Sequence, residues 1–207
     1  MLSPMALTLS NTITTLLTTK AMPSDLVQRI DTSLLYPPFF DKVALVLATA
    51  RAMGQDYVVI SGYRSHKEQA VIYAQGRTKP GKRVTNARAG FSAHNWGIAV
   101  DVVADVSQKR GLQPSWAPEV YLTLHKAALQ HGVQAGVPGL DDYGHLQFPL
   151  TQVLQRKEVE IFKTLNDVYA SGGMPAAWRQ LDVWGFAAET PKAVVSSALP
   201  PPTGAKG

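Results

Sequence analysis

The stretch Ser92–Asp101, with the sequence SAHNWGIAVD, contains a histidine and an aspartate seven residues apart. Residues 97–103 are mostly small or β-branched, lack proline and predict a β-strand. Alternate side chains of a strand share a face, so Asp101 is expected on the face opposite Val100. A turn before the strand can fold His94 back over it. Because imidazole nitrogens and carboxylates both bind transition metals, this stretch predicts part of a metal site.

A second stretch, Asp141–Phe148, offers the groups that such a site still needs. His145 opens a short apolar segment typical of a strand, and Asp142 precedes it by three residues. Two histidines and an aspartate form a zinc site with a position open for water. A further carboxylate beside that water is the general base that metal-assisted hydrolysis requires. A lone histidine is more often an ordinary, partly buried side chain, so the prediction depends on the combination.

The composition limits both the class of protein and the kind of site. The 207 residues suffice for one domain with a small appendage, and none of them is cysteine. Metal ligands are therefore restricted to histidines and carboxylates. The formal net charge of +5 fits either a generally basic surface or attraction to a polyanion. No run of about 18 apolar residues occurs, so no membrane span is expected.

Hydrophobic periodicity predicts helices and short strands around the two motifs. The expected elements are helices over 37–54, 66–75, 118–131, 151–170 and 174–186, and strands over 56–61, 97–103, 133–138 and from 145. Residues 76–90 are expected to form a loop rich in lysine and arginine. The predicted fold class is α+β, with a small, mostly antiparallel sheet, the zinc site on its open face and helices packed behind.

Three motifs together resemble a known group of enzymes. Residues 92–101 read Ser-x-His-x-x-Gly-x-Ala-x-Asp, residues 142–145 read Asp-x-x-His, and ISGYRS at 60–65 is followed by Glu68-Gln69. This order resembles the zinc peptidases that cut bacterial cell-wall peptides. That superfamily includes D-Ala-D-Ala carboxypeptidases and dipeptidases and the phage L-alanyl-D-glutamate endopeptidases. The resemblance covers residues 36–150.

The resemblance also implies what individual side chains do. Asp141 is the rival of Asp142 for the general base, and the family spacing selects Asp142. A guanidinium suits the family's carboxylate-binding arginine because it can form two parallel hydrogen bonds. The implied roles are Zn²⁺ ligands for His94, Asp101 and His145, general base for Asp142, substrate carboxylate binding for Arg64, and a place beside the substrate carbonyl or leaving group for Ser92.

We therefore expect a zinc-dependent peptidoglycan hydrolase that cleaves the stem peptide. The compact chain and the expected lack of an export signal favour an L-alanyl-D-glutamate endopeptidase of the phage endolysin type, and the resemblance implies the same through the aspartate at the base position. One alternative is a D-Ala-D-Ala carboxypeptidase, and another is a catalytically silent wall-binding module. A nucleic-acid-binding domain is disfavoured because no aromatic residue is interleaved with the basic residues of loop 76–90. The sequence leaves the identity of the native metal open.

The organisation and location of the protein follow from the same features. We expect a catalytic domain over 1–150, a helical extension over 151–189 with Trp178 and Trp184 packed on it, and a disordered Pro/Ala-rich tail over 190–207. Residues 1–20 predict a short helix instead of a signal peptide, because threonines interrupt the apolar run and the first basic residue is Lys20. We expect a monomer that is made in the cytoplasm and, after release, acts on the stem peptides of the wall. Anionic wall polymers are the other partners expected.

Overall fold

A computed structural model describes residues 30–107, 111–137 and 141–187 of the chain. The expected helix over 1–20 and the tail over 190–207 lie outside these residues. Its elements, in chain order, are η1 (Thr32–Leu34), α3 (Pro37–Ala52), β1 (Asp56–Ser61), α4 (His66–Ala74), η2 (Ala93–Trp96), β2 (Ala99–Asp105), β3 (Pro114–Ser115), η3 (Pro118–Tyr121), α5 (Leu122–Gln130), β4 (Gln134–Ala135), β5 (His145–Gln147), α6 (Leu150–Leu154) and α7 (Glu158–Val183).

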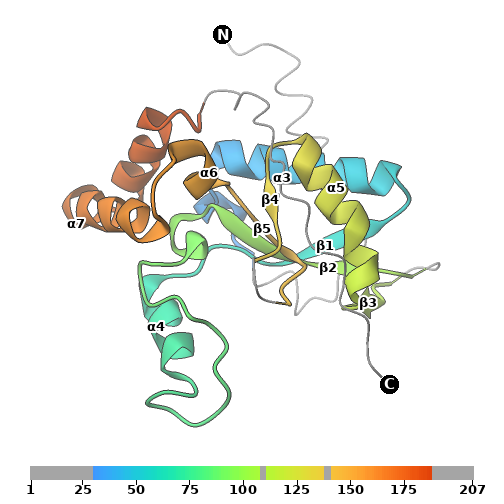
Figure 1. The fold of residues 1–207 in the computed structure, drawn as a ribbon, viewed down its shortest axis with the longest axis horizontal. Coiled ribbons are helices and arrows are strands. Elements are labelled where there is room, and N and C mark those ends of the chain that lie inside the picture. The colour runs from blue at the N-terminus through green and yellow to red at the C-terminus, as the bar shows by residue number, and fades with distance from the viewer. Residues whose placement is uncertain (1–29, 108–110, 138–140, 188–207) are drawn as a thin grey trace.

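The described strands form one antiparallel sheet. Its order is β1-β2-β5-β4, and β3 pairs with the end of β2. Helices α3 and α5 run along one side of this sheet, while α4 and the loop after it project away from it (Figure 1). Helix α7 lies at the end of the molecule remote from α5. This arrangement confirms the predicted α+β class.

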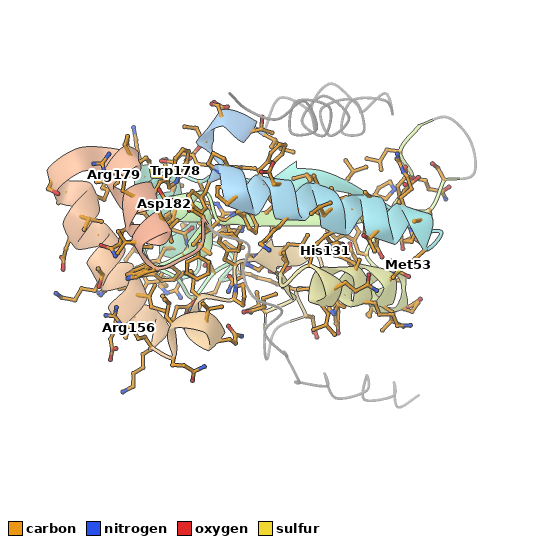
Figure 2. All side chains as sticks on the ribbon, turned by 90° about the horizontal axis from the view of Figure 1, so that it is seen from above. Met53, His131, Arg156, Trp178, Arg179 and Asp182 are labelled. Carbon is orange, nitrogen blue, oxygen red and sulfur yellow. The ribbon has the colours of Figure 1, made fainter. Side chains whose placement is uncertain are left out.

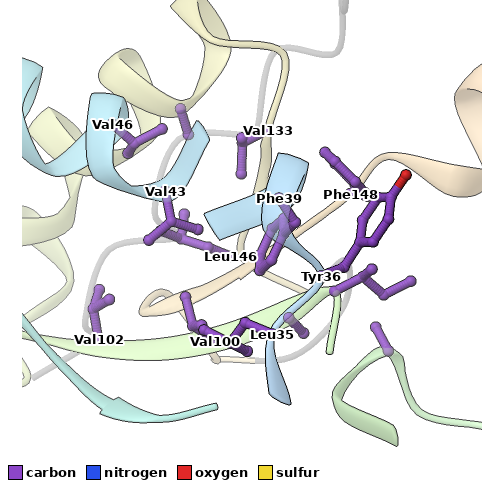
Figure 3. Packing of buried hydrophobic residues seen from close by; sticks show 14 of the residues in the cluster. Leu35, Tyr36, Phe39, Val43, Val46, Val100, Val102, Val133, Leu146 and Phe148 are labelled. Atoms are coloured by element: carbon purple, nitrogen blue, oxygen red, sulfur yellow. The ribbon is translucent and has the colours of Figure 1, made fainter. Parts of the chain in front are cut away.

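The core lies between the sheet and α3. Phe39, Val43 and Val46 of α3 face Val100 of β2 and Leu146 of β5 (Figure 3), and all five side chains are buried. Truncating such side chains to alanine costs about 2–5 kcal/mol of the free energy of unfolding. Because side chains alternate along a strand, this packing turns the neighbours of these strand residues to the other face of the sheet.

The observed elements differ from the predicted ones at several places, among them the three that follow. The second strand begins at Ala99 and ends at Asp105, because Gly97 has φ +69° and ends η2 instead of opening a strand. The helix expected over 151–170 is divided into α6 and α7 at Gln155, which has φ +51°. The helix predicted over 37–54 ends at Ala52, and Met53 after it is exposed.

The C-terminal part of α7 changes direction at two glycines. Gly172 and Gly173 have non-helical dihedral angles, as the expected break at this position requires, and the helix then continues to Val183. Trp178 and Trp184 of this second half are partly buried against the core. No helix of the described residues is long and apolar enough to cross a membrane.

Candidate metal centre

Three side chains from separate elements meet on the face of the sheet opposite α3. His94 comes from η2, Asp101 from the middle of β2, and His145 from the first position of β5, where it pairs directly with Asp101. Asp101 Oδ1 lies 3.0 Å from His145 Nδ1 and 3.4 Å from His94 Nε2. One ligand atom from each residue lies within 4.8 Å of the others, so the three can share one ion.

The second nitrogen of each imidazole is also engaged. His94 Nδ1 donates to the carbonyl oxygen of Gly62 at 2.7 Å, and His145 Nε2 donates to Gln147 Oε1 at 2.9 Å. A donated N–H fixes the ring orientation and leaves the other nitrogen available as a ligand. The donor set of two nitrogens and one carboxylate oxygen therefore fits Zn²⁺.

Gln147 is a site residue that the sequence reasoning missed. It stands two residues after His145 on β5, so both side chains lie on the same face of the strand. The spacing of two residues between the candidate ligand His145 and Gln147 is the sequence signal that could have identified Gln147.

The charges of the three residues are strongly coupled. Burial by itself raises the pKa of Asp101, but the charges and hydrogen bonds of His94 and His145 outweigh it and hold the pKa well below its usual range. Burial lowers the pKa of His145, but the hydrogen bond and the charge of Asp101 outweigh burial and raise it. Because ligands must be deprotonated, a metal held by these residues would displace the proton that they share.

The two neighbouring aspartates before β5 have different surroundings. Partial desolvation raises the pKa of Asp142, the negative charge of Asp101 raises it further, and His145, His94 and Arg64 oppose the shift. Although Asp142 is exposed as a residue, its carboxylate is thus close enough to interact with the charged groups of the site. Asp141 instead accepts a hydrogen bond from the Tyr143 hydroxyl at 3.2 Å.

Arg64 lies at the edge of the same cluster. Its Nη2 is 4.0 Å from Asp101 Oδ2, and its Nη1 donates to Gln69 Oε1 at 3.1 Å. Gln69 is fully buried and donates through Nε2 to the carbonyl oxygen of Ala87 at 2.6 Å. Gln69 therefore joins the guanidinium to loop 76–90.

Ser92 has different contacts from the other predicted site residues. It is the N-cap of η2, and its backbone N–H donates to Asn95 Oδ1 at 3.3 Å. These contacts join Ser92 to the turn and not to the three candidate ligands. His125 and His131 have partners elsewhere: His125 Nε2 is 2.9 Å from the carbonyl oxygen of Tyr143, and His131 Nε2 is 2.7 Å from Thr49 Oγ1.

Comparison with known proteins identifies the family. The family model VanY, D-alanyl-D-alanine carboxypeptidase, matches residues 33–136, half of the chain, and the chain belongs to this family. The peptidoglycan L-alanyl-D-glutamate endopeptidase CwlK of Bacillus subtilis (strain 168) is 46% identical over 67 residues. That match spans 32% of this chain and 40% of the length of CwlK.

Two solved structures are similar in part. The L-Ala D-Glu endopeptidase ChiX of Serratia marcescens has a TM-score of 0.40 and 25% sequence identity, covering 57% of this chain and 84% of that chain. A mutant of the vancomycin resistance D,D-pentapeptidase VanY from the VanB-type cassette was solved in complex with Zn(II). It has a TM-score of 0.40 and 21% sequence identity, covering 62% of this chain and 76% of that chain.

Proposed function

We propose that this protein is a zinc-dependent peptidoglycan peptidase that cleaves the bond between L-alanine and D-glutamate in the stem peptide. The observation that carries the proposal is the grouping of His94 Nε2, Asp101 Oδ1 and His145 Nδ1, in which each imidazole donates its other N–H to an oxygen. Membership of the VanY family supports a peptidase. The 46% identity to an L-alanyl-D-glutamate endopeptidase favours this bond over a terminal one.

In the proposed mechanism, His94, Asp101 and His145 hold Zn²⁺. A zinc ion at such a site supplies a water of lowered pKa and polarises a carbonyl oxygen. Asp142 accepts the proton of the attacking water and passes it to the leaving amine. Its raised pKa suits this task, because a base that must later act as an acid works best when its pKa lies near the working pH.

Arg64 orients the substrate through a carboxylate. Its guanidinium is half-buried, is held by Gln69 on one side and lies near Asp101 on the other. A substrate carboxylate that pairs with Arg64 would therefore place the neighbouring peptide bond beside the three ligands. Both D-glutamate and a terminal D-alanine offer such a group, so D-Ala-D-Ala carboxypeptidase activity is the second candidate, and the family description favours it.

The test is incubation of the purified protein with defined muropeptides, with and without a chelator, followed by mass spectrometry of the new ends. We expect a new N-terminal D-glutamate that the chelator abolishes and added zinc restores. Release of free D-alanine would contradict the endopeptidase and establish the carboxypeptidase. Binding to walls without cleavage under any metal would contradict both and favour a silent wall-binding module.

We further propose that a monomer acts on the cell wall and contacts its anionic polymers through the basic region 64–90, which comprises α4 and its flanking loops. Seven of the 20 Lys and Arg residues but only one of the 15 Asp and Glu residues lie within 64–90. This region therefore carries a net charge of +6, and the rest of the chain carries −1. Such a concentration of one sign raises the local concentration of a polyanion beside the site.

A further inference from the structure

The turn that carries His94 is too short to satisfy its own backbone. The 3-10 helix η2 has only four residues, so several carbonyl oxygens in and beside it lack a partner within the helix. Two of these oxygens are held within the family-matched region: Arg64 N donates to His94 O at 3.0 Å, and Tyr36 N donates to Gly97 O at 2.9 Å. The carbonyl oxygen of Trp96, at the end of η2, and that of Gly90, just before η2, need partners from elsewhere.

Both partners are side chains of α7. Asn166 Nδ2 donates to Gly90 O at 2.8 Å, and Trp178 Nε1 donates to Trp96 O at 2.9 Å. The two donors lie on opposite sides of the kink at Gly172 and Gly173, so one bent helix reaches both ends of the turn. Figure 2 shows Trp178 where the second half of α7 meets the start of α3, and its ring centroid is 6.0 Å from that of Tyr36.

The close packing at these contacts restricts the position of the turn relative to α7. A Cβ atom at Gly90 would lie 2.2 Å from Asn166 Oδ1, so the helix and the turn approach as closely as glycine allows. Asn95, which follows His94 and is fully buried, accepts from Gly90 N at 3.0 Å and donates to Arg64 O at 2.7 Å. The peptide units around Gly90 are thus fixed by α7 on one side and by Asn95 on the other.

We propose that α7 positions the metal-binding turn, and that Asn166 and Trp178 are positioning residues for His94. The inference rests on the metal site proposed above and goes beyond it, because the family match ends at residue 136 and α7 begins at Glu158. Helix α7 is therefore a working part of the metal centre and not a separate wall-binding appendage.

The physical reason is that metal affinity depends on where each ligand is held. Loss of an outer hydrogen bond that orients a ligand commonly lowers metal affinity by about 10–100-fold, and displacements of about 0.5 Å already matter. Because Asn166 and Trp178 act through the backbone next to His94, we expect the lower end of that range, about tenfold for each.

The experiment compares Trp178→Phe and Asn166→Ala with Trp184→Phe in the full-length protein. Trp178→Phe removes the N–H donor but keeps an aromatic ring. Trp184→Phe makes the same change at the C-cap of α7, at a ring that packs on the core but donates no hydrogen bond to the turn among the described residues. The Kd for Zn²⁺ is measured by competition with a chromophoric chelator, well below each variant's melting temperature. The absorption of bound Co²⁺ reports ligand geometry.

We expect Trp178→Phe and Asn166→Ala to raise the Kd for Zn²⁺ by about tenfold and to alter the Co²⁺ spectrum, with Trp184→Phe unchanged in both. Lower melting temperatures with wild-type Kd and spectra in both variants would overturn the inference and leave α7 a purely structural element. Equal metal loss in Trp184→Phe would also overturn it. A wild-type chain that binds neither ion would instead refute the metal site itself. Peptide cleavage is not a readout here, so the two failures are distinguishable.

Discussion

Asp141 and Asp142 are chemically identical neighbours with different surroundings. Asp141 is paired with the Tyr143 hydroxyl, whereas the charge of Asp142 interacts with Asp101, both candidate histidine ligands and Arg64. Asp142 is therefore the residue that we propose to exchange a proton with a group bound between the ligands. This difference makes the pair a matched test of the proposed base.

Asp142→Asn is expected to lower kcat by about 10²–10⁴-fold, the usual contribution of a general base, while zinc stays bound. His94→Ala should lose both zinc and turnover.

Because the base acts when deprotonated and the pKa of Asp142 is raised, the wild-type kcat/KM should fall as the pH drops, and this fall should occur at a higher pH than for an ordinary aspartate. Steady-state kinetics against pH, with metal content measured in parallel, checks this prediction.

Asp141→Asn is the control, since it removes the same charge one residue away. It should keep its metal and most of its kcat. Equal loss of turnover in the two variants, or loss of zinc from Asp142→Asn, would show that the roles are assigned wrongly.

At the scale of elements, the junction between η2 and β2 depends on one glycine. Gly97 has φ +69°, and a Cβ atom there would lie 2.3 Å from the carbonyl oxygen of Leu34. The same residue accepts the hydrogen bond from Tyr36 N that ties the start of α3 to the turn. This close approach sets where β2 begins and hence which face of the sheet Asp101 occupies.

Gly97→Ala is therefore expected to destabilise the protein more than Gly54→Ala does. Both glycines have positive φ, but a Cβ at Gly54 would meet nothing within 4 Å. Positive φ costs an alanine about 1–3 kcal/mol at either site, and the clash adds about 2 kcal/mol or more at Gly97. Urea denaturation of both variants measures the difference, and equal losses would refute the role of the close approach.

At the scale of the whole molecule, the positive charge is concentrated in one projecting region. The seven basic residues of 64–90 lie on α4 and its flanking loops, which stand away from the sheet (Figure 1). The guanidinium of Arg77 stacks on Tyr73 at 3.9 Å and that of Arg88 on Phe91 at 4.1 Å. These contacts hold two of the charges in place within this region.

Lys82→Glu combined with Arg83→Glu should weaken binding to poly(glycerol phosphate) by about 30-fold or more at low salt, because each of the two basic residues near an anionic surface contributes about 1 kcal/mol. The loss should shrink as salt screens the charges. Binding assays over a range of ionic strengths measure both effects.

Lys126→Glu combined with Lys157→Glu makes the same net change on the exposed surface of other elements and should have little effect. If this charge-matched variant loses as much affinity, the attraction belongs to the overall charge and not to the region after α4.

Much of the local structure was predictable because its signals are local. The residues 37–52 form a helix that begins at two prolines, and Ser65 caps α4 in a capping box with Glu68. The division between α6 and α7 was missed because it depends on Gln155 in a left-handed conformation that no sequence signal requires. Gln147 was missed, and Gln69 was noted in a motif without a role, because an amide becomes a site residue only through the partner that it contacts.

The sequence by itself determined which residues are available as ligands, the alternation that separates Asp101 from the core, and the class of fold. Only the tertiary structure decided how these parts combine: which imidazole nitrogen faces Asp101, which aspartate interacts with the charges of the centre, and that α7 holds both ends of the His94 turn. The reason is physical. Periodicity and capping act over a few residues, whereas a metal centre is built by contacts between segments tens of residues apart, and those form only when the core packs.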